Sequence, residues 1–163
     1  MILRLIDRVL DTLLFVVLMA MVVIVTANVF CRFVLNFSIY WGDEAAQALL
    51  VWLTFLGSAV VVRERGHYSF DYLARVASAR WQLFVAVTSR VITILGIIGL
   101  FYWSAEVAWG IRPWIMPAME ISRMYVYIAG PIGCAFMLLY ALVDLRRVVR
   151  EHRAPEDGLL LAD

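Results

Sequence analysis

Three stretches of the sequence are too long and too apolar to belong to a water-soluble fold. Residues 12–31, 45–62 and 124–143 contain no charged side chain. Each is close to the length of about 20 residues that crosses a bilayer core about 30 Å thick as a helix. The composition agrees, because 64% of the 163 residues are apolar and 17% are charged, with a mean hydropathy of +0.88. Since soluble folds cover themselves with more polar groups than this, the sequence predicts an all-α integral membrane protein.

One further span, residues 84–106 and third in chain order, contains one arginine inside a mostly apolar stretch. Trp81 to Ser89 and Val91 to Ala105 are uncharged, and Arg90 separates them. A central arginine costs about 3 kcal/mol on insertion scales, whereas about a dozen Leu, Ile, Val and Phe side chains return roughly 5 kcal/mol. The segment is therefore expected to insert, with Arg90 either reaching the cytoplasmic surface or facing a partner helix.

The arginines outside the spans divide unevenly between the two sides of the predicted membrane domain. Ten lie in the N-terminal segment, the second loop and the tail: Arg4, Arg8, Arg63, Arg65, Arg75, Arg80, Arg146, Arg147, Arg150 and Arg153. The first and third loops hold three, Arg32, Arg112 and Arg123. Because positive residues are retained on the cytoplasmic side, both termini are predicted to be cytoplasmic, with two hairpins facing outward.

Two segments beside the spans have the pattern of short interfacial amphipathic helices. In residues 1–11 the charged side chains fall on one helical face, which predicts a helix in the membrane plane that leads into the first span. Residues 68–80 have a similar pattern, and the alternative there is a solvated linker. Residues 1–153 are thus expected to form a single membrane domain with four transmembrane helices. Residues 154–163 are expected to form a disordered cytoplasmic tail.

Polar residues, which are costly beside a span, gather around the first outward hairpin. Arg32 and Asn36 precede it, and Asp43 and Glu44 follow it. The planar guanidinium of Arg32 can bind a carboxylate, so a pair with either acid would hold the first two helices in register. A second, compatible interpretation is that the acids begin the second helix, where they complement its dipole. Adjacent acids diverge by about 100° on a helix, which disfavours a shared metal ion or paired-acid catalysis.

The remaining reactive side chains do not form a known type of site. Cys31 and Cys134 match no zinc or redox spacing. His67 and His152 lie in cytoplasmic segments, where they cannot clamp a haem between helices. No Ser-His-Asp or Cys-His arrangement has a recognisable spacing, and a net charge of +1 gives no field to gather nucleic acid. The sequence therefore predicts no enzyme activity, no cofactor, no metal and no nucleic-acid partner.

Small residues within the spans predict faces where helices approach closely. These residues are Gly57, Ser58 and Ala59 in the second span, Gly96 and Gly99 in the third, and Ala129, Gly130, Gly133 and Cys134 in the fourth. Spacing alone leaves open whether the partner helix belongs to this chain or to another protein. Pro131 is expected to kink the fourth span. Beyond that proline the sequence lacks the broken helices and paired repeats typical of a transporter's substrate site, which favours a scaffold.

In order and spacing these residues resemble the small membrane subunit of tripartite ATP-independent periplasmic (TRAP) transporters, the DctQ-like family. The resemblance rests on Arg32-Phe33, Asn36, Trp41, Asp43-Glu44, Trp52, Phe55-Leu56-Gly57 and Gly66-His67 with Asp71. The four-span layout with both termini inside is similar too, so the resemblance covers nearly the whole chain. Two positions depart from the family pattern. Asp43 stands where glutamate is more usual, and Ser38 stands where proline is common.

The resemblance implies a division of labour within a bacterial cytoplasmic (inner) membrane. A large membrane permease subunit would bind substrate and sodium and move by an elevator mechanism, and a periplasmic substrate-binding protein would deliver an organic acid. The present chain would be a non-catalytic scaffold in contact with the large subunit and the lipid bilayer. Structural or partner contacts would involve Arg32, Asn36, Trp41, Asp43, Glu44, Trp52 and Gly57, while Arg63, Arg65 and His67 would fix the cytoplasmic end.

Two other classes of function compete with the scaffold hypothesis. An autonomous small membrane transporter or channel would produce solute flux when the purified chain is reconstituted alone. A membrane redox or hydrolytic enzyme would show a cofactor absorbance, or an activity that is lost when Cys31 or His67 is replaced.

Overall fold

The computed structural model describes residues 2–68 and 79–159 of the chain. Its elements are α1 (Ile2–Val34), α2 (Gly42–Tyr68), α4 (Ala79–Gly110), the short α5 (Met124–Tyr127) and α6 (Ala129–Leu159). Four stretches are long and apolar enough to cross a membrane: Arg4–Val34, Gly42–Glu64, Val87–Gly110 and Met124–Arg146. The predicted all-α fold with four membrane-spanning stretches is confirmed, and the cytoplasmic location of the termini stays a prediction.

The first helix is longer than the sequence predicts. Residues 2–11 do not form a separate helix in the membrane plane, because α1 runs without interruption from Ile2 to Val34. This expectation was wrong because two acids of this segment, Asp7 and Asp11, bind side chains of other helices of the chain, as described below. The second expected interfacial segment, residues 68–80, lies largely outside the described residues.

The last helix also runs further than the expected domain boundary at residue 153. α6 ends at Leu159, inside the segment for which the sequence predicts disorder. The boundary and the helix end therefore do not coincide, and the disorder of the tail stays a prediction.

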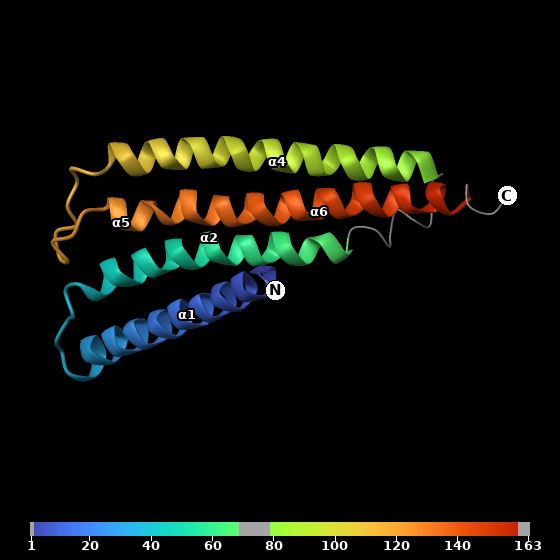
Figure 1. Cartoon of the computed structure of the whole chain (residues 1–163). Coiled ribbons are helices and arrows are strands. Elements are labelled where there is room, and N and C mark those ends of the chain that lie inside the picture. The colour runs from blue at the N-terminus through green and yellow to red at the C-terminus, as the bar shows by residue number, and fades with distance from the viewer. Residues whose placement is uncertain (1, 69–78, 160–163) are drawn as a thin grey trace.

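The long helices lie side by side in one row, in the order α1, α2, α6, α4 (Figure 1). The helix that is last in the sequence, α6, thus lies between α2 and α4 and packs against both. Burial follows this arrangement. The buried share of residues in the most apolar stretch of each span differs between the helices. This share is 44% in the span that contains α6, but 6% in α1 and 11% in α4. The two helices at the ends of the row therefore leave most of their surface free for lipid or for another protein.

Small residues allow the close contact of α6 with its neighbours. A β-carbon placed on Gly133 would lie 2.7 Å from Cβ and 2.9 Å from the carbonyl oxygen of Phe55 in α2. One placed on Gly130 would lie 2.8 Å from Cβ of Ser104 in α4. The predicted small-residue face of this span thus packs within the chain. Gly96 and Gly99 of α4 differ, since nothing lies within 4 Å of the equivalent position.

The span that contains Pro131 is interrupted before the proline. α5 ends at Tyr127 and α6 begins at Ala129, which places Pro131 in the first turn of α6, where its missing N–H is tolerated. The indole N–H of Trp52 in α2 donates a hydrogen bond of 3.2 Å to the carbonyl oxygen of Tyr125, next to the interruption. Trp52 therefore supports the backbone where this span begins.

Candidate functional site: polar contacts between the helices

The loop end of the α1–α2 hairpin is held by Asn28, a residue that sequence reasoning did not single out. The Asn28 side chain is 7% exposed, and its amide N–H donates a 2.7 Å hydrogen bond to the carboxylate of Asp43. Gly42 allows this approach, because a β-carbon there would lie 3.0 Å from Cγ of Asn28. The contact joins α1 to the first turn of α2.

This finding corrects the expected pairing of Arg32. Asp43 binds Asn28 and Glu44 binds backbone amides, whereas the ion pairs of the described residues involve Arg63 and Arg90. Arg32 is exposed in the last turn of α1, where its charge complements the negative end of the helix dipole. The second interpretation of Asp43 and Glu44 agrees with the structure, since both acids lie in the first turn of α2.

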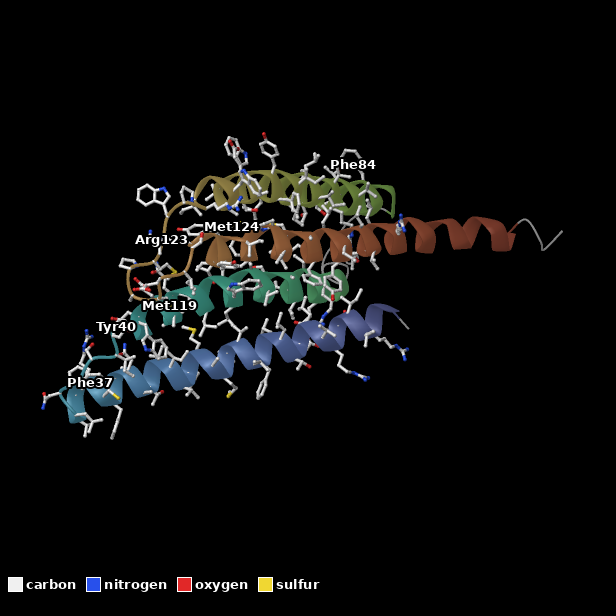
Figure 2. All side chains as sticks on the ribbon, turned by 60° about the vertical axis from the view of Figure 1, so that its left-hand side comes forward. Phe37, Tyr40, Phe84, Met119, Arg123 and Met124 are labelled. Carbon is white, nitrogen blue, oxygen red and sulfur yellow. The ribbon has the colours of Figure 1, made fainter. Side chains whose placement is uncertain are left out.

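Glu44 connects α2 to the loop between α4 and α5. Its carboxylate accepts hydrogen bonds from the backbone N–H groups of Ala118, at 3.1 and 3.2 Å, and Met119, at 3.0 Å. This part of the loop folds back on itself. Met116 N–H donates to the carbonyl of Ile121 at 2.8 Å, and Glu120 has a positive φ of 53°. Figure 2 shows Met119 in this loop, beside the start of α2. Glu44 therefore clamps the loop between α4 and α5 onto the first turn of α2.

At the opposite end of the spans, Arg63 of α2 lies among polar groups of α1 and α6. One terminal nitrogen of Arg63 bonds the Asp11 carboxylate at 2.9 Å, and the other lies 3.7 Å from Asp7, which is too long for a hydrogen bond. The Tyr140 hydroxyl donates to Asp7 at 2.7 Å. Asp7 and Asp11 of the segment 2–11 thus attach α1 to α2 and α6.

Arg90, the arginine within the predicted span 84–106, also has a partner in the chain. Its Nε lies 2.7 Å from a carboxylate oxygen of Asp144 in α6, and the side chains are 11% and 22% exposed. Of the two positions expected for Arg90, the structure therefore supports the one against a partner helix. The α4 span begins at Val87 and the span that contains α6 ends at Arg146, so the pair of Arg90 with Asp144 lies near one end of both spans.

The other predicted site residues do not gather with these contacts. Asn36 has a positive φ of 53° in the turn after α1, a conformation that asparagine tolerates better than most residues. Trp41 is 39% exposed just before α2. Gly57 faces α1, since a β-carbon placed there would lie 3.8 Å from Cδ1 of Leu14. The backbone of His67 belongs to α2, but its side chain lies outside the described part of the chain.

Five side-chain participants were missed by sequence reasoning: Asn28, Asp7, Asp11, Tyr140 and Asp144. A signal existed for Asp7 and Asp144, because a carboxylate near an apolar span calls for a cationic partner. The spacing of residues does not reveal which arginine that partner is. Asn28 and Tyr140 are ordinary residues in apolar runs, and only the packing of the helices gives them a role.

The contacts connect helices rather than surround a reaction centre. Among the described residues, no group of three or more His, Cys, Asp or Glu side chains could hold a metal ion. The polar contacts form two layers, one near each end of the spans, with apolar packing between them. The fold and these contacts define a multi-pass helical membrane protein whose charged groups hold its own spans together.

Comparison with known sequences gives the family. The chain belongs to the DctQ component family of tripartite ATP-independent periplasmic transporters, whose sequence profile matches residues 21–151. The chain is 28% identical to the C4-dicarboxylate TRAP transporter small permease protein DctQ of Vibrio cholerae over 85% of this chain and 73% of that protein. It is 30% identical to the protein of the same name from Pseudomonas aeruginosa over 76% of this chain and 60% of that protein.

Family membership confirms several predictions made from the sequence. The protein is a small permease subunit of a TRAP transporter, a component of a transport system and not an enzyme. It is a multi-pass protein of the bacterial inner membrane. The function of the subunit within its complex is considered next.

Proposed function

We propose that this subunit is a scaffold that braces the large membrane permease of a TRAP transporter. The observation that carries the proposal is the contrast between polar groups and apolar surface. Arg63 and Arg90 pair within the chain, whereas α1 and α4, at the ends of the row, are mostly unburied. Large apolar side chains are exposed on both helices, among them Phe15, Val23, Ile92, Leu95, Tyr102 and Trp103. Such surfaces suit the apolar helices of a larger subunit together with lipid.

We also propose that the assembled transporter imports an organic acid, delivered by a periplasmic substrate-binding protein and coupled to sodium. Support comes from the relatives, two of which are named as C4-dicarboxylate transporter subunits. The described part of this chain offers no cluster of acidic or metal-binding side chains for a cation. On this proposal the substrate and sodium sites belong to the large subunit.

The orientation proposed for the chain places both termini in the cytoplasm. Arginine is concentrated in the N-terminal segment, in the loop between α2 and α4 and in the tail, which is the pattern of cytoplasmic segments. The Glu44 clamp and the 111–123 loop would then face the periplasm. A reporter fused after residue 163 tests this: a fluorescent protein should fold there, and an active periplasmic phosphatase fused at the same point would contradict it.

The scaffold proposal is tested by assembly and by transport. A tagged chain is expressed with its large permease subunit, purified in mild detergent and reconstituted with the binding protein, and uptake of a labelled C4-dicarboxylate is measured with sodium or potassium outside. Co-purification of the large subunit and sodium-dependent uptake only by the complete set are expected. A stable complex that fails to form, or flux through this chain alone, would contradict the scaffold role.

A further inference from the structure

A small pocket of mixed polarity opens between α2, α5 and the 111–123 loop. Its volume is about 90 Å³, and eight residues line it: Glu44, Gln47, Ala48, Val51, Met116, Arg123, Val126 and Tyr127. One lining residue, Glu44, also makes the loop contact described above. Arg123, labelled in Figure 2, is the last residue of the loop and lies immediately before α5.

The polar side chains on the two walls of the pocket differ in their chemistry. Glu44 and Gln47 are three residues apart on α2, so their side chains share one face and offer carboxylate and amide oxygens. Arg123 and Tyr127 are four residues apart and offer guanidinium and hydroxyl donors. One wall therefore presents acceptors to a cation, and the other wall presents donors to an anion.

Two of these side chains are free to bind. Within the described residues the side chains of Gln47 and Arg123 make no hydrogen bond or ion pair, and both are exposed. The Glu44 carboxylate already accepts two backbone N–H groups, which fixes its position and leaves lone pairs for a further donor. The pocket is thus held in place by the same clamp that folds the loop.

The depth of the pocket matches the boundary between head groups and hydrocarbon. Glu44 and Arg123 lie at or beside the first residues of two spans, Gly42–Glu64 and Met124–Arg146. Val51 and Val126 lie further along these spans and give the pocket an apolar floor. A bilayer has a head-group region of several ångströms outside its hydrocarbon core, so the polar rim lies at head-group level.

We propose that this pocket binds the head group of a phospholipid that carries a primary ammonium and a phosphate, that is, a phosphoethanolamine lipid. The ammonium lies at Glu44 and Gln47, the phosphate lies at Arg123 and Tyr127, and the first carbons of the acyl chains lie on Val51 and Val126. An ammonium with three N–H donors fits the acceptor wall, whereas a quaternary ammonium has none to donate. An anionic head group without a cation leaves Glu44 facing negative charge. The assignment goes beyond the scaffold role and does not depend on it.

The test uses the full chain purified in detergent, with bound lipid counted by native mass spectrometry after exchange against phosphatidylethanolamine, phosphatidylglycerol or phosphatidylcholine. One phosphatidylethanolamine should be retained preferentially. Arg123→Ala should weaken its retention about tenfold or more, because a charge-assisted contact is lost, and Arg123→Lys should restore part of it. Arg112→Ala is the matched control, since Arg112 is an exposed arginine of the same loop that lies over the Trp109 ring at 5.6 Å.

Four outcomes would overturn the assignment. Equal retention of the three lipids, or an Arg123→Ala protein that keeps the lipid while its elution profile is unchanged, would remove the head-group site. Soluble phosphoethanolamine that binds as tightly as the lipid would point to a free solute. Loss of the lipid on assembly with the large permease subunit, with Arg123 protected there from chemical modification, would assign the pocket to a side chain of that subunit.

Discussion

The Nε of Arg90 lies 2.7 Å from the carboxylate of Asp144, and this ion pair joins α4 to α6 near one end of their spans. Replacing one member breaks this largely buried ion pair, and breaking a fully buried pair costs about 3–5 kcal/mol. Arg90→Ala and Asp144→Asn are therefore expected to lower the melting temperature of the purified protein clearly. The double variant Arg90→Met with Asp144→Leu should recover much of the loss, because an apolar pair of similar size replaces the ion pair. Arg146→Ala, an exposed arginine two residues away, is the control.

The Glu44 clamp predicts a local effect in the 111–123 loop. Removing the carboxylate in Glu44→Ala leaves the N–H groups of Ala118 and Met119 without their acceptor. Amide hydrogen exchange at these two residues should accelerate by about tenfold or more, since charge-assisted hydrogen bonds contribute about 1.5–3 kcal/mol. Glu120→Gln changes an exposed acid in the same loop and should leave the exchange unchanged. Equal exchange in wild type and Glu44→Ala would contradict the clamp.

The glycines of the spans should respond differently to the same substitution. Gly133→Ala places a methyl group 2.7 Å from Phe55 Cβ and 2.9 Å from its backbone oxygen, so α2 and α6 must separate. A loss of about 1–3 kcal/mol is expected from such overpacking, measured as a lower midpoint of thermal unfolding in detergent. Gly96→Ala meets open space and should be neutral or slightly stabilising, because alanine favours a helix over glycine. If the two single variants changed the midpoint of thermal unfolding equally, the packing described would be contradicted.

The attachment of α1 to α2 and α6 can be measured as a coupling between residues. Arg63→Ala and Asp11→Ala remove the two partners of the 2.9 Å ion pair, and the double variant should lose less stability than the sum of the single variants. Tyr140→Phe removes a hydroxyl that donates to Asp7, for which a loss of about 0.6 kcal/mol is typical within membranes. Unfolding in a mixture of dodecyl maltoside and increasing dodecyl sulfate gives these free energies. Strict additivity of Arg63→Ala and Asp11→Ala would mean that the pair is uncoupled.

The sequence predicts the helices well because length and hydropathy alone decide whether a segment can cross a bilayer. The four spanning stretches and the insertion of the segment with Arg90 follow from that rule. The contacts around Arg32, Asp43 and Glu44 could not be predicted in the same way. Sequence neighbours suggest a pair of Arg32 with an acid, whereas the helix packing brings Asn28 to Asp43 and a distant loop to Glu44.

Residues 2–11 illustrate the same difficulty. Their periodicity correctly indicates a polar face and an apolar face, but periodicity does not tell whether the polar face meets water or another helix. Arg63 and Tyr140 lie more than fifty positions away from Asp7 and Asp11, so the contacts of these two acids depend on tertiary structure.

The position of α6 between α2 and α4 has a consequence for biosynthesis. The ribosome completes α1, α2 and α4 before α6 exists, so at that stage α4 lacks its main neighbour and Arg90 lacks Asp144. The nascent chain then consists of a joined pair, α1 with α2, and a helix α4 that has not yet met its neighbour α6. Insertion of the C-terminal helix is the event that unites them, so quality-control proteases should recognise chains that are truncated before α6.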